Sequence, residues 1–132
     1  MIWAFNLNGT LVDAKPAIDA VSISTPDIDW VKEFKKSLDK LKPLPALTVY
    51  QDADRDDECV AILTDMRKET AVMILRHLKI WPAFLVCGLD DNAKLQWLKR
   101  APEQGVWVDT DKAFLERVRN ETEWRVIDAE TL

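Results

Sequence analysis

The sequence has one histidine and two cysteines, which is too few for the common structural zinc sites. Cys59 and Cys87 form no CxxC pair, and each stands beside apolar residues typical of a strand. We interpret both as buried free thiols. His77 lies within a predicted helix, without a cysteine cluster nearby, so we do not expect a zinc site.

The sequence also lacks a long hydrophobic run. No apolar stretch approaches the roughly 20 residues that a membrane-spanning helix requires. The first stretch, residues 2–5, is interrupted by polar residues, and no basic segment precedes it as in a signal peptide. We therefore expect a soluble protein of the cytoplasm that makes no contact with a membrane.

Basic residues are outnumbered, since 18 Lys and Arg stand against 23 Asp and Glu, for a formal net charge of −5. This balance disfavours broad, non-specific binding of nucleic acid, although a local basic patch can still hold phosphate. The predicted helical segment 30–41 carries four lysines, which we interpret as a solvated face: Lys32, Lys35, Lys36 and Lys40.

The remaining composition is that of one globular domain. The chain has 132 residues, of which 48% are hydrophobic, enough to form a substantial core. No repeat, low-complexity tract or linker divides it. We therefore predict a single domain over residues 1–132.

Short apolar strands alternate with amphipathic helical segments along the chain. Strands are predicted at 2–7, 47–50, 60–63, 83–87, 106–108 and 124–127, and helices at 30–41, 68–79, 92–100 and 112–119. Thr64 and Asp65 have the chemistry of helix N-caps for the 68–79 helix. The alternation predicts an α/β fold, a three-layer Rossmann-like parallel sheet with helices on both faces.

Polar residues follow several of these strands. In open parallel sheets, ligands bind beyond the carboxyl ends of the strands. Asn6 and Asn8 follow the first strand, Thr64 follows the 60–63 strand, and Asp109 follows the 106–108 strand. Lys94 lies near the start of a helix and can reach the same crevice. The sequence therefore predicts a polar site at this edge.

Four segments resemble the motifs of the haloacid dehalogenase-like hydrolases. FNLNGTLVD resembles the first motif, an apolar strand followed by Asp-x-Asp-Gly-Thr-Leu-x-Asp. VAILT resembles the second motif, NAKLQWLK resembles the third through Lys94, and VWVDTD resembles the acidic fourth. The motifs occur in the family's order between residues 2 and 111. The resemblance implies the family's fold with a minimal cap, a small flap and helix inserted at 14–45.

The resemblance also implies the roles of individual residues in a magnesium-dependent phosphatase that forms an aspartyl-phosphate. The catalytic positions, for nucleophile, acid/base and charge stabiliser, are Asn6, Asn8 and Lys94. The phosphate-binding positions are Gly9, Thr10, Thr64 and Arg67. The magnesium positions are Asn6, Asn8 through its backbone carbonyl, Asp109 and Asp111. Arg67 stands three residues after Thr64, whereas nucleic-acid-end and nucleotide phosphatases of this family often have the arginine two after, and it is also compatible with a surface residue at a helix start.

Both reactive carboxylates of the family are amides in this chain. A carboxamide is a very poor nucleophile and has no proton to exchange near neutral pH, so we expect no hydrolysis. The lost charge at Asn6 should also weaken magnesium binding. Because Lys94 and Asp109 are retained, two origins fit: a natural pseudoenzyme that binds phosphate, or a substitution made to inactivate an enzyme. By itself, the segment 6–9 is also compatible with a simple strand-to-turn transition.

The insertion at 14–45 is too short for a large cap domain. The site should be open unless a second copy, a protein partner or a bulky substrate covers it. This favours a nucleotide or a nucleic-acid end over a small metabolite as the phosphate monoester. The alternative is a non-enzymatic regulatory or protein-binding module that uses the surface near Trp30.

The segment DADRDDECVAIL begins like a calcium-binding loop, with Asp52, Asp54 and Asp56 at alternate positions. Asp57 replaces the glycine of that loop, and Leu63 replaces its bidentate glutamate. We therefore interpret the segment as a solvated acidic loop.

Overall fold

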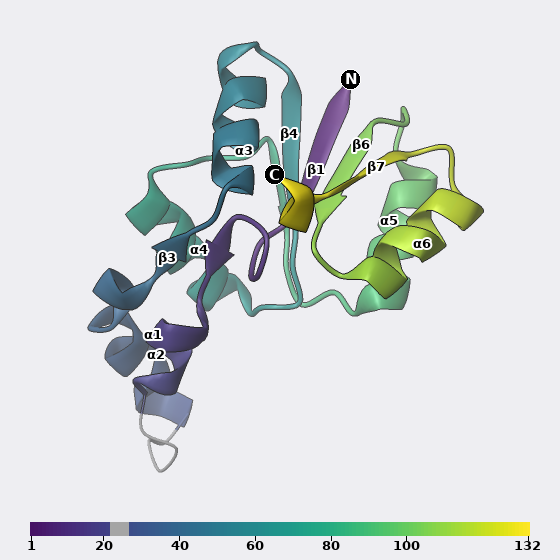
Figure 1. Cartoon of the computed structure of the whole chain (residues 1–132). Coiled ribbons are helices and arrows are strands. Elements are labelled where there is room, and N and C mark those ends of the chain that lie inside the picture. Colours follow the sequence, from purple (N-terminus) through teal and green to yellow (C-terminus); the bar gives the residue numbers. More distant parts are fainter. Residues whose placement is uncertain (22–26) are drawn as a thin grey trace.

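The computed structural model describes residues 1–21 and 27–132, which form a central parallel sheet between two helical layers (Figure 1). The five strands, in spatial order, are β5 (Phe84–Val86), β4 (Cys59–Leu63), β1 (Ile2–Asn6), β6 (Val106–Asp109) and β7 (Arg125–Asp128). One face is covered by α3 (Ala46–Arg55) and α4 (Lys68–Leu78), and the other by α5 (Asp91–Arg100) and α6 (Lys112–Glu121). The predicted three-layer α/β fold is confirmed.

Successive residues of the central strands point to opposite helical layers. Phe5, Ile62 and Val108 belong to the core cluster that also contains the buried residues of α3 and α4. Ala4 and Trp107, which are paired neighbours in the sheet, belong to the cluster beneath α5 and α6. Both faces of the sheet are therefore buried, which explains why β1 and β6 are apolar up to their last residues, Asn6 and Asp109.

One predicted strand is wrong, because residues 47–50 lie within α3. The buried residues of this helix are Ala46, Tyr50 and Ala53, which are spaced four and three residues apart as on one helical face. A short apolar run does not distinguish a strand from part of a buried helix. Asp52 and Asp54 consequently lie in the last turns of α3, and only residues 56–58 of the predicted acidic loop connect this helix to β4.

Other boundaries also differ from the prediction. The segment 30–41 contains the end of α2 (Asp27–Lys35) and a separate turn, η1 (Leu38–Lys40). Arg67 is the N-cap residue of α4 and makes no side-chain cap bond, so the predicted capping by Thr64 and Asp65 is wrong. The hydroxyl of Thr64 instead accepts a hydrogen bond from the backbone N–H of Met66 (3.1 Å).

The two cysteines are free, as predicted, but each is half-buried rather than fully buried. Burial raises the pKa of the Cys87 thiol, and Lys68 lowers it in part. Both side chains pack against the edges of the core clusters.

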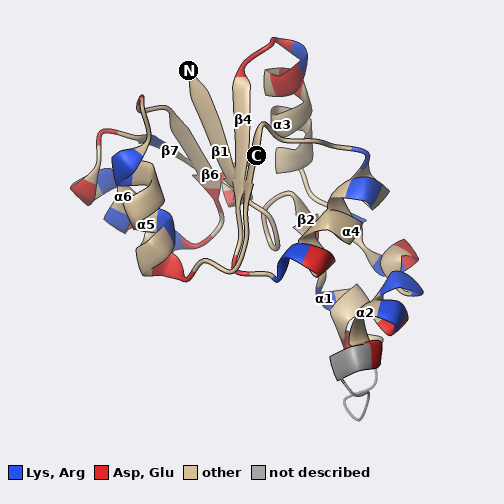
Figure 2. Ribbon diagram, turned by 180° about the vertical axis from the view of Figure 1, so that it is seen from behind, with Lys and Arg blue, Asp and Glu red and all other residues tan. Residues whose placement is uncertain are grey.

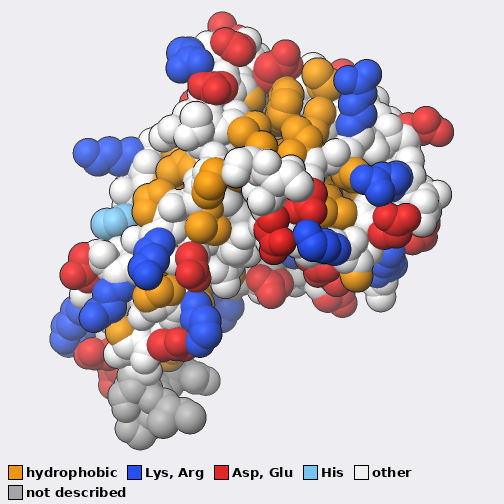
Figure 3. Space-filling view, viewed as in Figure 1, with side chains coloured by type: hydrophobic (Ala, Val, Ile, Leu, Met, Phe, Trp, Pro, Cys, Tyr) orange, Lys and Arg blue, Asp and Glu red, His pale blue; other side chains and the backbone are white. Residues whose placement is uncertain are grey.

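The described parts of the segment 14–45, residues 14–21 and 27–45, lie beyond the carboxyl ends of β1 and β4 (Figures 1 and 2). They contain α1 (Lys15–Asp19), α2 and η1, and β3 (Lys42–Pro43) pairs antiparallel with β2 (Val12–Asp13). Figure 3 shows acidic and basic side chains interspersed over one face of the molecule. Among the described residues, no helix has the length and apolar character needed to cross a membrane.

Candidate functional site

The carboxyl ends of three adjacent strands bring the predicted site residues to one edge of the sheet. Asn6 ends β1, Thr64 follows β4, and Asp109 ends β6. Lys94 comes from the first turn of α5, and its side chain is buried although it carries a charge. Thr64 and Asp109 are buried as well, whereas Asn6 is half-buried.

The side chain of Asn6 connects the buried lysine to the buried carboxylate. Lys94 Nζ donates to Asn6 Oδ1 (3.3 Å), and Asn6 Nδ2 donates to Asp109 Oδ1 (3.3 Å). Asn6 Nδ2 also donates to the backbone carbonyl of Asn8 (3.1 Å). An ammonium group only donates, and carboxylate and carbonyl oxygens only accept, so these partners determine which way the amide is turned.

Asp109 accepts further hydrogen bonds at the same oxygen. The backbone N–H groups of Thr110 (2.7 Å) and Asp111 (3.2 Å) and the hydroxyl of Thr10 (3.4 Å) all donate to Oδ1. Burial raises the pKa of Asp109, and the Asp111 and Thr110 amides and Lys94 partly offset this effect by stabilising the anion.

The turn at Gly9 and Thr10 is held mainly by its own backbone. Gly9 has φ +86°, a conformation that favours glycine. Its N–H donates to the Val12 carbonyl (2.7 Å), and the N–H of Thr10 donates to the Leu7 carbonyl (3.3 Å). These two amides already have partners within the turn. They are therefore less available to phosphate than the sequence pattern indicates.

Three other predicted site residues make contacts of their own. Asn8 Oδ1 accepts from the N–H of Ala14 (3.0 Å) and so links the site to the segment 14–45. Asp111 caps α6 by accepting from a backbone N–H of its first turn. The guanidinium of Arg67 lies over the ring of Trp30, 5.6 Å from its centroid.

Comparisons with known proteins identify the fold. The chain resembles a candidate beta-phosphoglucomutase from Thermotoga maritima, with TM-score 0.66 and 17% identity over 95% of this chain and 83% of the other. A haloacid dehalogenase-like family protein from Streptococcus pneumoniae gives TM-score 0.63 and 14% identity, over 98% and 95% of the two chains. The HAD domain of effector protein Lem4 from Legionella pneumophila gives TM-score 0.60 and 16% identity, over 96% and 83%. The fold is that of the haloacid dehalogenase-like hydrolases. No family model matches the sequence, and no curated protein matches it significantly.

Magnesium, the cation that hydrolases of this fold generally use, does not fit the arrangement around Asn6. Its amide N–H₂ group points at Asp109 Oδ1 and at the Asn8 carbonyl, the two oxygens predicted to hold the cation. An N–H group cannot ligate a cation, and magnesium prefers several oxygen ligands in near-octahedral geometry. In residues 1–21 and 27–132, no group of three His, Cys, Asp or Glu side chains is placed to hold a metal ion.

Sequence reasoning missed Thr110, which connects two loops of the site. Its hydroxyl donates to the Gly9 carbonyl (3.0 Å), and its N–H donates to Asp109. The only signal in the sequence is its position between two acidic residues in VWVDTD. Its partner lies about a hundred residues earlier in the chain, so this contact requires knowledge of the fold.

Proposed function

We propose that this chain binds a phosphate monoester, preferably a nucleotide or a nucleic-acid end, on a phosphatase-type scaffold without hydrolysing it. The observation that carries this proposal is the series of hydrogen bonds from Lys94 through Asn6 to Asp109. The buried ammonium group of Lys94 is therefore held at the site by an amide, Asn6, which stands where the family has its nucleophilic carboxylate.

Several donors support anion binding at this edge of the sheet. Lys94 is a buried cation whose one described partner is the neutral Asn6 amide. The Thr64 hydroxyl accepts from Met66 and keeps its own proton for a ligand. Within the described residues, no hydrogen bond uses the backbone N–H of Asn8 or Asp65. Hydrogen bonds from an ammonium group to phosphate are stronger than those between neutral groups, so Lys94 is the principal anion ligand in this proposal.

The same geometry argues against turnover. The Asn6 oxygen accepts from Lys94, and its nitrogen donates to Asp109, so no carboxylate is available to attack phosphorus. Asn8 has no acidic proton for a leaving group, and its Oδ1 is engaged with Ala14. The bound monoester should therefore remain intact.

Binding should also be independent of magnesium. The Asn6 N–H₂ group links the Asn8 carbonyl to Asp109 without a cation. The single negative charge of Asp109 is balanced nearby by Lys94, to which it is joined through the amide. A divalent cation would have to displace the amide from both oxygens.

An NMR titration of the ¹⁵N-labelled chain with inorganic phosphate or vanadate tests this proposal. We expect amide shifts at Asn8, Thr64 and Asp65 that are the same with magnesium and with chelator. Lys94→Met should abolish them, whereas Lys99→Met should not, because that lysine lies at the other end of α5 and is paired with Glu121. Absence of shifts at millimolar phosphate, or shifts unaffected by Lys94→Met, would contradict the proposal.

The second candidate is a protein-binding module. Trp81 and Phe84, which are 62% and 47% exposed, lie at the β5 edge of the sheet, away from the phosphate site. Large exposed aromatic side chains are common at protein interfaces. If phosphate fails to bind at all, protein binding becomes the better-supported function of this chain.

A further inference from the structure

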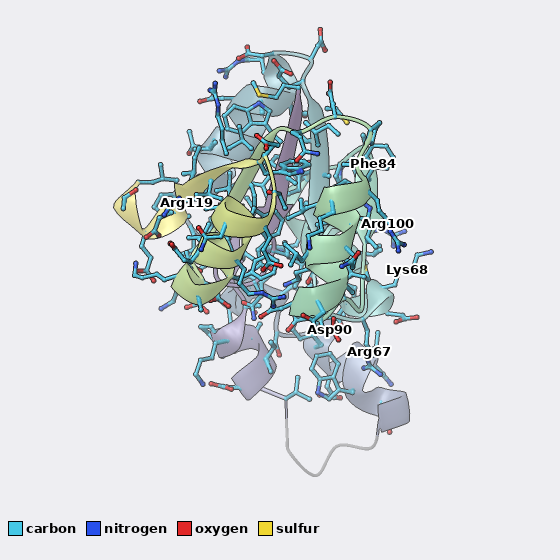
Figure 4. The ribbon with its side chains drawn as sticks, turned by 90° about the vertical axis from the view of Figure 1, so that its right-hand side faces the viewer. Arg67, Lys68, Phe84, Asp90, Arg100 and Arg119 are labelled. Atoms are coloured by element: carbon cyan, nitrogen blue, oxygen red, sulfur yellow. The ribbon has the colours of Figure 1, made fainter. Side chains whose placement is uncertain are left out.

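A recess of about 350 Å³ lies beside the candidate phosphate site. It is lined by Trp30 of α2 and by Asp65, Met66, Arg67 and Thr70 from the loop after β4 and the start of α4. Asp65 directly follows Thr64, so the recess and the phosphate site share one loop. In Figure 4, Arg67 lies near the level of Asp90, the residue before α5, and further helices extend below it.

The wall of this recess is a stack of flat groups. The rings of Trp30 and Phe34 are stacked, with centroids 5.0 Å apart and planes 11° from parallel. Phe34 is fully buried and Trp30 is half-buried, so the core holds the inner part of the stack in place. The Arg67 guanidinium lies over the Trp30 ring at 5.6 Å and forms the exposed part.

The chemistry of the lining matches a planar, nitrogen-rich ring. Nucleobases stack on aromatic rings and on arginine guanidinium planes, and an aliphatic sugar gains little from either. The Asp65 carboxylate is exposed at the recess and can accept from ring or amino N–H groups. The volume lies at the lower end of the range for small-molecule pockets, which suits a single nucleoside.

We propose that the recess formed by Trp30 and Arg67 binds the base of a nucleoside monophosphate whose phosphate lies at Lys94 and Thr64. This inference rests on the proposed function, because it requires a phosphate at that site. The inference adds the base, which is the part of the ligand that determines specificity. Trp30 comes from the segment 14–45, so that segment sets the choice of ligand.

Isothermal titration calorimetry of the full chain with inorganic phosphate, ribose 5-phosphate and nucleoside monophosphates tests the inference. Because a nucleotide has a base that can stack in the recess and ribose 5-phosphate has none, we expect the nucleotides to bind about tenfold more tightly. Trp30→Leu should remove this difference and leave ribose 5-phosphate affinity unchanged. Trp81→Leu is the matched control, since Trp81 is exposed and outside the recess, and it should change neither affinity.

A second variant tests the inference in case Trp30→Leu does not fold. Arg67 is exposed and makes no side-chain cap bond, so Arg67→Gln should fold and still reduce nucleotide affinity several-fold. Quenching of tryptophan fluorescence by nucleotide, absent in Trp30→Leu, provides an independent readout.

The outcomes separate the two proposals. Equal affinities for ribose 5-phosphate and nucleotides, both lost in Lys94→Met, would overturn the base-binding recess and leave the proposed function intact. Failure of inorganic phosphate and every monoester to bind would overturn both. Phosphotyrosine binding as tightly as the nucleotides would show that the recess accepts any planar ring, which overturns the assignment to a nucleoside.

Discussion

The side-chain nitrogen of Asn6 donates a hydrogen bond to Oδ1 of Asp109 over 3.3 Å. This contact joins the ends of β1 and β6, and with Lys94 on the other side of the amide it forms a polar series that needs no cation. An amide at position 6 therefore does more than remove a reactive carboxylate, because it makes hydrogen bonds that an ionised carboxylate cannot make.

Asn6→Asp should make stability depend on magnesium. The new carboxylate would face Asp109 and the Asn8 carbonyl without a proton to donate, at a cost on the order of 2 kcal/mol in unfolding free energy. A cation bound there would restore the loss. Thermal melts should show no magnesium effect for the unchanged chain, a lower melting temperature for Asn6→Asp with chelator, and recovery with magnesium.

Asn120→Asp is the control for this measurement, because Asn120 is exposed on α6. It should melt at the same temperature with and without magnesium. If magnesium raised the melting temperature of the unchanged chain, this would contradict the role assigned to the Asn6 amide.

Asn6→Asp combined with Asn8→Asp should create magnesium-dependent phosphatase activity. Thr64, Lys94 and Asp109 already lie at the edge of the sheet where β4 and β6 end and α5 begins, and such groups provide most of the electrostatic stabilisation in phosphoryl transfer. Asn6→Asp alone should restore metal binding with slow phosphoenzyme formation at most, and Asn8→Asp alone should have no activity. Hydrolysis of aryl phosphates and nucleotides, with chelator as the control, measures this. A double variant that binds magnesium yet hydrolyses none of them would favour the protein-binding module.

Asn8→Ala should destabilise the chain, and Asn8→Asp should not. The Asn8 side chain accepts from the Ala14 N–H at 3.0 Å, and an aspartate oxygen can accept the same bond. Leaving this buried N–H unpaired costs about 1–3 kcal/mol. Urea unfolding of the two variants measures the difference, and equal stabilities would show that the contact contributes nothing.

Tyr50→Phe should stabilise the chain by about 1 kcal/mol. Tyr50 is fully buried and packs on Phe5 with ring centroids 5.3 Å apart, and its hydroxyl has no hydrogen-bond partner among the described residues. Burial raises the pKa of this phenol, so it remains protonated. Removing the hydroxyl keeps the ring contact and eliminates an unsatisfied polar group. A lower melting temperature for Tyr50→Phe would show that the hydroxyl has a partner in solution.

The order of the elements and the position of the site could be predicted because they depend on local patterns. Apolar runs such as 60–63 mark buried strands, and the polar residues that follow them must lie at one edge of a parallel sheet. The run at 47–50 failed because its apolar residues fit both a strand and one face of a helix. Flanking residues could not settle the choice, since the burial of Tyr50 against Phe5 comes from tertiary packing.

The contacts that give the site its chemistry could not be predicted. The orientation of the Asn6 amide depends on Lys94 and Asp109, which reach it from distant parts of the chain. The stacking of Arg67 on Trp30 likewise requires α2 to lie against the start of α4. Sequence spacing alone carries no information on such pairs.

The placement of β1 in the middle of the sheet has a consequence for folding during synthesis. This strand pairs with β4 on one side and β6 on the other, so Trp3 must pair with both Val60 and Val106. Contacts between residues so far apart in sequence slow folding. During synthesis at the ribosome, the strand that carries Asn6 therefore keeps one hydrogen-bonding edge open until Val106 has emerged, and this edge can then pair with another chain or be bound by a chaperone.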